Sequence, residues 1–153
     1  MKVLMVCYGN ICRSPLAQGI LERKVEERDL DWEIDSAATA AYHVGEPPDE
    51  RSIQVARQQG LDISGQRARM LSRQDLDDYD VILCMDRPVW ETVRAMCRTD
   101  AQRDKVKLIG DYMEPSGPGY IPDPYYHDFG AFEYVYDLLD DALERFVKHH
   151  NPE

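Results

Sequence analysis

The fold of this protein is decided by residues 3–27, which read VLMVCYGNICRSPLAQGILERKVEE. Residues 3–6 form a continuous apolar run, which is typical of a strand buried on both faces. Residues 15–27 have their apolar side chains at the spacing of one helix face. Residues 7–14, here called the first loop, lie between these two segments. The stretch therefore predicts a buried strand, a short loop and a helix.

Strand-like and helix-like segments alternate along the rest of the chain. The expected strands are residues 32–34, 80–85 and 106–109, and the expected helices are residues 49–59, 89–96 and 132–148. This alternation predicts an α/β fold, a three-layer sandwich in which a four-stranded parallel sheet has helices on both faces. Such sheets bind ligands beyond the carboxyl ends of their strands, so we expect the chemistry in the first loop.

Length and composition indicate one cytoplasmic domain. The chain has 153 residues, 43% of them hydrophobic, and we expect residues 1–153 to form a single domain with one core. No N-terminal segment is long and apolar enough for export or for spanning a bilayer, which predicts a soluble protein without membrane contact. A net charge of −11 argues against a nucleic-acid partner, although a local pocket can still bind a small anion.

The four cysteines, at positions 7, 12, 84 and 97, are expected to be free thiols. Their spacing does not match a zinc site, so no structural metal is expected. A cysteine near a strand is most often a small buried hydrophobic residue, and we interpret Cys84 and Cys97 in this way. For Cys7 the same interpretation would leave its neighbours in the first loop unexplained.

The first loop, CYGNICRS, combines residue types that suit an anion. Gly9 and Asn10 tolerate positive φ, which lets the backbone curl and point successive N–H groups inward at the start of a helix. Arg13 adds a planar guanidinium that can hold two phosphate oxygens. The positive field favours the thiolate form of Cys7, and Ser14 is placed to donate a hydrogen bond to it. The loop therefore predicts a nucleophile inside a phosphate-binding site.

The same residues carry a resemblance to a known family. VCYGNICRSP, residues 6–15, resembles the signature of the low-molecular-weight protein tyrosine phosphatases, and its Gly-Asn-Ile-Cys interior is narrower than the general Cys-x5-Arg-Ser pattern. DSAAT at 35–39, ILCMD at 82–86 and DPYY at 123–126 match as well, and the agreement covers nearly the whole chain. The resemblance implies a flavodoxin-like, phosphotyrosine phosphatase I-like fold. It also implies hydrolysis of protein phosphotyrosine and small aryl phosphates through a cysteinyl-phosphate on Cys7, without a metal or other cofactor.

Asp123 is the candidate general acid. Such a reaction needs a carboxylic acid that protonates the departing phenolate and later deprotonates the attacking water. Asp123 stands in a loop rich in Pro and Gly, residues 113–124, of the kind that carries function at the rim of an α/β sheet. From the residues alone it could equally be a turn residue before Pro124. The resemblance implies the catalytic role, whereas Asp128 is expected to be the N-cap of the last helix.

The resemblance also implies the walls of a substrate pocket. Tyr125 and Tyr126, which could otherwise be core aromatics, are placed at the pocket mouth, where a phosphotyrosine ring would pack. The other implied pocket residues are Tyr8, Ile11, Tyr42 and His43. Relatives that act on phosphoarginine carry Thr at the position of Ile11, so an apolar Ile11 favours an aryl phosphate.

Supporting roles are implied for residues in and around the first loop. The implied phosphate-binding residues are Tyr8, Gly9, Asn10, Ile11, Cys12 and Ser14. Ser36 and Gln66 are expected to support Asn10, and Gln66 stands where relatives often have His. Cys12 lies in the same loop as Cys7, and a disulfide between them would be a reversible redox switch. The alternative is that Cys12 is a packed small residue.

Three other functions share parts of this pattern. A thioredoxin-coupled arsenate reductase resembles the same fold but needs two relay cysteines closer together than Cys84 and Cys97. A non-catalytic phosphotyrosine-binding module would have lost Cys7 or Asp123. A phosphocarrier of sugar transport has no use for Arg13 together with a general acid. The resemblance favours a phosphatase, a monomer by default, whose partner is a phosphotyrosine-containing protein; for bacterial members this is often a tyrosine kinase of polysaccharide export.

Overall fold

Strands alternate with helices throughout the part of the chain that the computed structural model describes, residues 1–152. The strands are β1 (Lys2–Cys7), β2 (Glu33–Ala38), β3 (Val81–Cys84) and β4 (Val106–Leu108). The helices are α1 (Arg13–Glu27), α2 (Glu50–Gln58), α3 (Asp75–Asp78), α4 (Arg87–Met96), α5 (Asp100–Lys105) and α6 (Phe129–His150), with a 3-10 turn η1 (Ile109–Tyr112).

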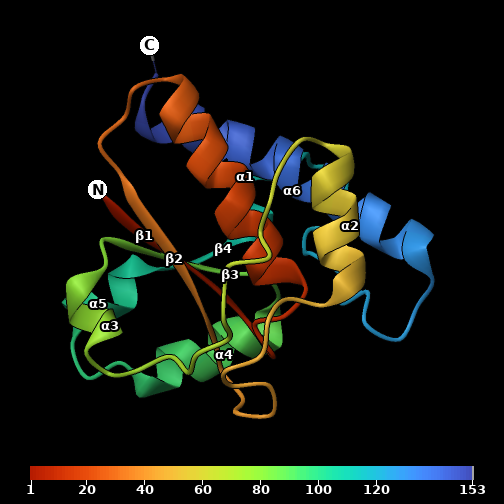
Figure 1. Cartoon of the computed structure of the whole chain (residues 1–153). Coiled ribbons are helices and arrows are strands. Elements are labelled where there is room, and N and C mark those ends of the chain that lie inside the picture. Colours follow the sequence, from red (N-terminus) through yellow and green to blue (C-terminus); the bar gives the residue numbers. More distant parts are fainter. Residues whose placement is uncertain (153) are drawn as a thin grey trace.

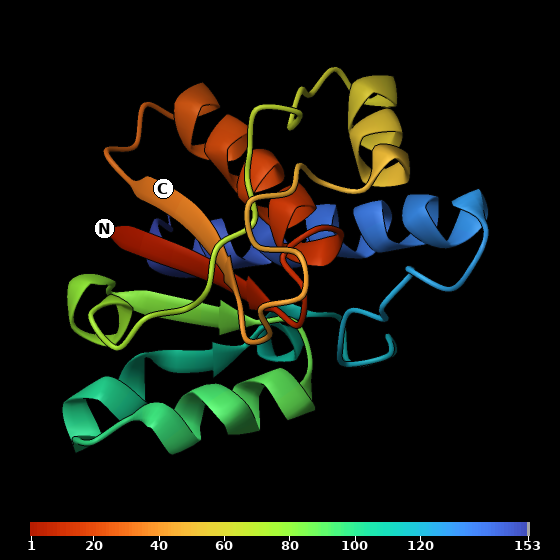
Figure 2. The same cartoon turned by 60° about the horizontal axis from the view of Figure 1, so that its bottom comes forward.

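The four strands form one parallel sheet in the order β2-β1-β3-β4, so the predicted sheet is confirmed (Figure 1). In its register Val6 lies opposite Ala37 of β2 and Cys84 of β3. The chain turns to one side of β1 for β2 and to the other side for β3, which makes the carboxyl end of β1 the switch point. Figure 2 shows all strands pointing to the end of the sheet where the loop between β1 and α1 lies.

Both faces of the sheet are covered by helices, as the sequence predicts. The residues of β1 from 3 to 6 are completely buried and alternate between two cores. Val3 and Met5 pack in the core that contains the apolar faces of α1 and α6, whereas Leu4 and Val6 pack with Val89 of α4. A strand enclosed on both faces explains the continuous apolar run at residues 3–6.

Three expectations about individual elements need correction. The second strand is longer than residues 32–34, because residues up to Ala38 pair with β1 although several of them are small or polar. The short helices α3 and α5 were not predicted, since their polar sequences have no apolar periodicity. The last helix begins at Phe129 rather than at residue 132, and Asp128 is its N-cap as expected, because its Oδ1 accepts the Ala131 amide at 3.3 Å.

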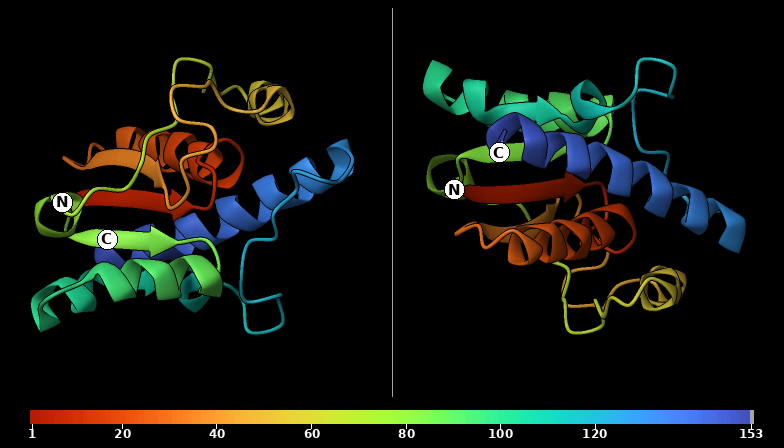
Figure 3. Two further views of the ribbon diagram at one scale, coloured as in Figure 1. Left: turned by 90° about the horizontal axis from the view of Figure 1, so that it is seen from below. Right: turned by 90° about the horizontal axis from the view of Figure 1, so that it is seen from above.

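The long helix α6 runs from the end of the sheet where the first loop lies to the opposite end. Figure 3 shows its last turn near the start of β1, away from the first loop. There Phe146 packs against Trp32 and His150, with ring centroids 6.0 and 4.5 Å away. Neither α6 nor any other helix within residues 1–152 combines the length and hydropathy that crossing a membrane requires.

Candidate active site

The first loop curls at the carboxyl end of β1 and leads directly into α1. Asn10 has φ 57°, a left-handed conformation that Asn tolerates better than most residues. Of the two residues expected to tolerate positive φ, Asn10 adopts it and Gly9 does not. Gly9 serves close packing instead: a Cβ there would lie 3.3 Å from the His43 ring. Gly9 thus lets the His43 ring pack against the first loop.

Cys7 lies at the floor of the site with 2% of its surface exposed. The backbone amide of Asn10 donates to its Sγ at 3.2 Å, and the Ser14 hydroxyl lies 3.0 Å from the same atom. Asn10 Nδ2 donates to Ser14 Oγ at 2.6 Å, which leaves the Ser14 hydrogen available for Cys7. Two donors thus converge on this one sulfur atom.

The Asn10 side chain is held by three neighbours. Its Nδ2 also donates to Ser36 Oγ at 3.0 Å, and its Oδ1 accepts the Arg69 amide at 3.1 Å. Gln66, which was expected to support Asn10, does not bond to it: Gln66 Nε2 donates to the Pro15 carbonyl at 3.0 Å. Gln66 therefore reaches the loop through the start of α1, and Arg69 supplies the bond to Asn10 that sequence analysis missed.

Arg13, the first residue of α1, is 3% exposed and points into the same site. Its Nη1 donates to Asp86 Oδ2 at 2.6 Å and to the Ile121 carbonyl at 2.9 Å. Burial by itself lowers the pKa of Arg13, but the negative charges of Cys7 and Asp86 more than offset this and raise it. The guanidinium is thus a permanent cation, and its Nε and Nη2 donors are not used by the bonds to Asp86 and Ile121.

Asp86 is a site residue to which the sequence analysis assigned no role. Its Oδ1 accepts the Val89 amide at 3.0 Å and caps α4, while its Oδ2 holds Arg13. One carboxylate therefore joins the helix after β3 to the helix after β1. An Asp directly after a buried strand and before a helix was the available signal, but its partner 73 positions away is visible only in the fold.

Asp123 is held in the loop that joins η1 to α6. The Ile121 amide donates to the Met85 carbonyl at 2.9 Å, which fixes the loop to the end of β3. Two residues further on, Asp123 Oδ2 lies 3.9 Å from Arg13 Nη2, and Oδ1 accepts the Tyr125 amide at 3.1 Å. Its side chain is 46% exposed, so the carboxyl group lies at the rim where a leaving group would depart.

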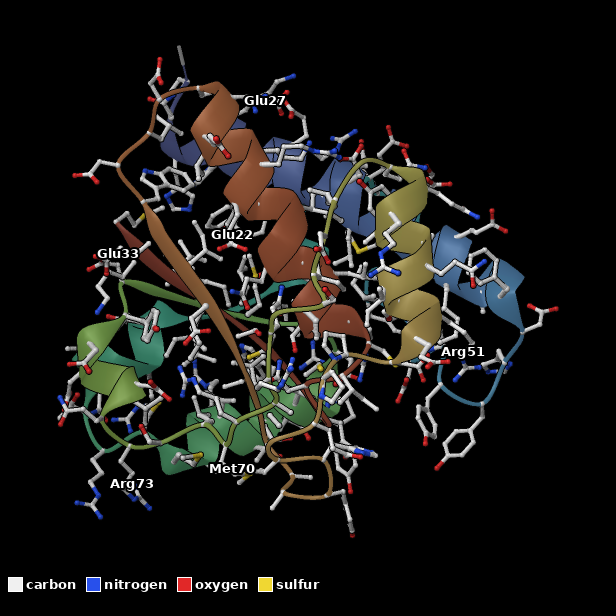
Figure 4. The ribbon with its side chains drawn as sticks, in the orientation of Figure 1. Glu22, Glu27, Glu33, Arg51, Met70 and Arg73 are labelled. Carbon is white, nitrogen blue, oxygen red and sulfur yellow. The ribbon has the colours of Figure 1, made fainter. Side chains whose placement is uncertain are left out.

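Arg51 clamps the same loop from the other side, and sequence analysis missed it. It lies at the start of α2 and reaches toward the segment before α6 (Figure 4). Its guanidinium donates to the carbonyls of Tyr125 and His127, both at 2.9 Å. Asp49, the N-cap of α2, orients it at 3.0 Å; burial alone would raise the pKa of Asp49, but the bonds to Arg51 lower it overall.

These elements enclose a cavity of about 610 Å³ above the first loop, here called the active-site cavity. It is lined by Cys7, Tyr8, Gly9, Ile11, Cys12, Arg13, Tyr42, His43, Asp123, Tyr125 and Tyr126. The structure thus brings together every residue that the resemblance implied for the pocket. The tilted rings of Tyr8 and Tyr42 lie with centroids 6.1 Å apart, and Tyr125 and Tyr126 meet edge to face at 4.9 Å. An aryl group can pack between such rings.

The cavity also contains a second cysteine, Cys12. Cys12 is 4% exposed, and burial together with the negative charges of Asp49 and Cys7 raises the pKa of its thiol. A neutral thiol is a poor nucleophile, so Cys12 does not compete with Cys7. All four cysteines are free thiols. Within residues 1–152 no cluster of three His, Cys, Asp or Glu side chains is arranged to hold a metal ion.

Comparison with known proteins identifies the family. The family model described as low molecular weight phosphotyrosine protein phosphatase matches residues 2–153. The chain belongs to this family. It is similar to the low molecular weight protein-tyrosine-phosphatase YfkJ of Bacillus subtilis, with 38% identity over 148 residues that cover 95% of this chain and 93% of that protein. The chain is therefore an enzyme, a protein tyrosine phosphatase with phosphoprotein substrates.

Solved structures agree with this family assignment. The crystal structure of a protein tyrosine phosphatase from Entamoeba histolytica with Hepes in the active site matches with TM-score 0.93 and 30% identity, over 99% of this chain and 98% of that chain. A Drosophila arginine phosphatase also matches with TM-score 0.93, at 37% identity over 99% of this chain and 98% of that one. The family's fold thus accommodates more than one kind of phosphorylated side chain.

Gly110 provides a test of how the Asp123 loop is positioned in this phosphatase. A Cβ at Gly110 would overlap the backbone carbonyl of Gly119. Gly110→Ala must therefore displace the Asp123 loop at Gly119, two residues before Ile121. We expect kcat for phosphotyrosine to fall by about 10- to 100-fold, the cost of misplacing a catalytic group by about 1 Å. Gly65→Ala is the matched control, because nothing lies within 4 Å of that added Cβ. A Gly110→Ala enzyme that folds and turns over normally would contradict this role.

Proposed function

We propose that this protein hydrolyses protein phosphotyrosine through a covalent phosphate ester on Cys7. The observation that carries the proposal is the convergence of two donors on the Cys7 sulfur next to the buried guanidinium of Arg13. A nucleophile at the floor of an aromatic-walled cavity suits a phosphate at the end of an aryl group.

The proposed reaction has two steps. The Cys7 thiolate attacks phosphorus while the loop amides and Arg13 hold the phosphate oxygens, and the P–O bond to the tyrosine breaks. Asp123 gives its proton to the departing phenolate, which would otherwise be a poor leaving group. In the second step Asp123, now a carboxylate, takes a proton from a water that attacks the phosphocysteine. Inorganic phosphate leaves, and the thiolate is restored.

Ile11 supports phosphotyrosine rather than phosphoarginine as the substrate. Its side chain lines the active-site cavity and offers only an apolar surface to the ligand. Phosphoarginine is the second candidate, because the chain is similar to an arginine phosphatase of Drosophila. A guanidinium carries several N–H donors that an apolar wall leaves without partners, whereas a phenyl ring carries none.

The substrate class is tested by comparing phosphotyrosine and phosphoarginine peptides of identical flanking sequence. We expect kcat/KM to be at least about tenfold higher for phosphotyrosine. Ile11→Thr should move this ratio toward phosphoarginine, and Ile11→Val is the matched control, since Val and Thr share a shape and differ in the hydroxyl group. Equal kcat/KM for the two peptides in the wild type, or an equal change of their ratio in both variants, would show that Ile11 does not select the substrate.

The positions of the cysteines bear on the arsenate reductase alternative and on the compartment of the enzyme. Cys84 is completely buried in β3, and burial raises the pKa of its thiol, so it is a poor relay for an arsenate reductase. The four free thiols are typical of a reducing compartment, and we place the enzyme in the cytoplasm on this ground.

Cys12 remains our proposed redox partner of Cys7. A peroxide would oxidise Cys7 to a sulfenic acid, and the Cys12 sulfur would then form a disulfide with Cys7 and displace water.

A further inference from the structure

A second groove adjoins the active-site cavity and has no role in the reaction just described. Its volume is about 420 Å³, and its apolar lining comes from Pro88, Leu108, Tyr120 and Ile121. Asp123 lines both the active-site cavity and this second groove. The active-site cavity and the second groove therefore meet at Asp123.

Arg87 is the cation of this groove. Among the described residues that line the groove, it is the one Lys or Arg, and within residues 1–152 it makes no ion pair. It is exposed, and its Cζ lies 5.5 Å from the centroid of the Trp90 ring, which restrains the guanidinium by a cation–π contact. What distinguishes Arg87 from other arginines without an ion pair, such as Arg94 on the same Trp90 ring, is its place in the lining of the groove.

The acidic groups of the groove do not neutralise Arg87. Asp86 is bound to Arg13 at 2.6 Å, and Asp123 lies 3.9 Å from Arg13 as well. Both carboxylates thus share the charge of Arg13 inside the catalytic centre, whereas the charge of Arg87 remains available to a ligand. The complement of Arg87 itself is a carboxylate, and the complement of the apolar lining is an apolar segment that carries that carboxylate.

We propose that the second groove binds the polypeptide next to the phosphotyrosine, and that Arg87 pairs there with an acidic residue of the substrate. This inference rests on the proposed function, because the phosphotyrosine must occupy the active-site cavity. With the aryl phosphate buried in that cavity, the substrate backbone lies at its mouth and must leave along an adjoining surface. The groove is such a surface, with an apolar floor for neighbouring side chains and one cation for their charge.

The test uses phosphotyrosine peptides that differ in one flanking residue. Each peptide carries Asp, Asn or Lys at one of three positions on either side of the phosphotyrosine, and kcat/KM is measured for the full chain. At the best position we expect Asp to be favoured over Lys by about fivefold at low salt, the range of an exposed ion pair, and much less at about 0.5 M salt. Arg87→Glu should reverse the preference to Lys at that same position.

Arg94→Glu is the matched control. Arg94 lies on the same helix, contacts the same Trp90 ring at 4.9 Å and does not line the groove, about 10 Å further along α4. For Arg94→Glu, the ratio of kcat/KM for the Asp peptide to that for the Lys peptide should equal the wild-type ratio. An unchanged ratio in Arg87→Glu would overturn the inference and leave Arg87 as a surface charge. Turnover of p-nitrophenyl phosphate, with Cys7→Ser as the blank, reports separately whether the proposed function itself fails.

Discussion

Cys7→Ser is expected to lower kcat for aryl phosphates by at least about 10⁴-fold, to the level of the blank. A serine hydroxyl has no neighbouring general base here: its closest partners are the Ser14 hydroxyl and the Asn10 amide, and both act as donors in this site. The two donors stabilise a thiolate that already carries its charge, but they cannot remove a proton from an alcohol. The first chemical step should therefore stop while phosphate binding by Arg13 persists.

The control for this experiment is Cys97→Ser. Cys97 is also a buried free thiol, and its Sγ donates to the Val93 carbonyl at 3.5 Å, a bond that a serine can make as well. It lies outside the active-site cavity, so Cys97→Ser should retain normal turnover. Mass spectrometry after rapid acid quench should find one added phosphate on wild-type Cys7 and none on Cys7→Ser. Retained turnover in the Cys7→Ser enzyme would falsify the cysteinyl-phosphate scheme.

Asp123→Asn is expected to slow substrates according to their leaving group. For phosphotyrosine, whose phenolate is basic, we expect kcat to fall by about 10²- to 10⁴-fold, the usual contribution of a general acid. For p-nitrophenyl phosphate, whose leaving group needs little protonation, the loss in the first step should be far smaller. The asparagine keeps the size of the side chain and can still accept the Tyr125 amide, so the loop geometry is retained.

Asp128→Asn separates this effect from a general loss of charge in the loop. Asp128 lies five residues further along and caps α6 through the Ala131 amide, and asparagine is an equally good N-cap. The slope of log kcat/KM, which reports the first step, against leaving-group pKa should therefore be that of the wild type in Asp128→Asn and steeper in Asp123→Asn. If Asp123→Asn reduced kcat/KM equally for all leaving groups, Asp123 would not be the general acid and another acid would have to be found.

The position of the site could be predicted from local sequence because its central part is one continuous loop. Cys7, Asn10, Arg13 and Ser14 stand within eight residues of each other, and the strand and helix on either side have clear apolar periodicity. Asp123 was identifiable only with the family resemblance, since a turn residue before proline has the same local sequence. Of the two residues expected to support Asn10, Ser36 bonds to it, whereas Gln66 bonds to the Pro15 carbonyl, because an amide side chain can use several partners and only the packing selects one.

The sequence by itself determined the parallel sheet and the place of the first loop between β1 and α1, with Cys7 and Arg13 near its ends, since periodicity and spacing within short segments are sufficient for these. Only the tertiary structure decided how separate loops join into one site. Asp86 holds Arg13 across 73 positions, and Arg51 holds the Tyr125 carbonyl across 74. The same holds for Arg87, whose place beside Asp123 is invisible in the sequence. Long-range hydrogen bonds and charge pairs depend on where the sheet brings its loop ends together, and no local pattern encodes those distances.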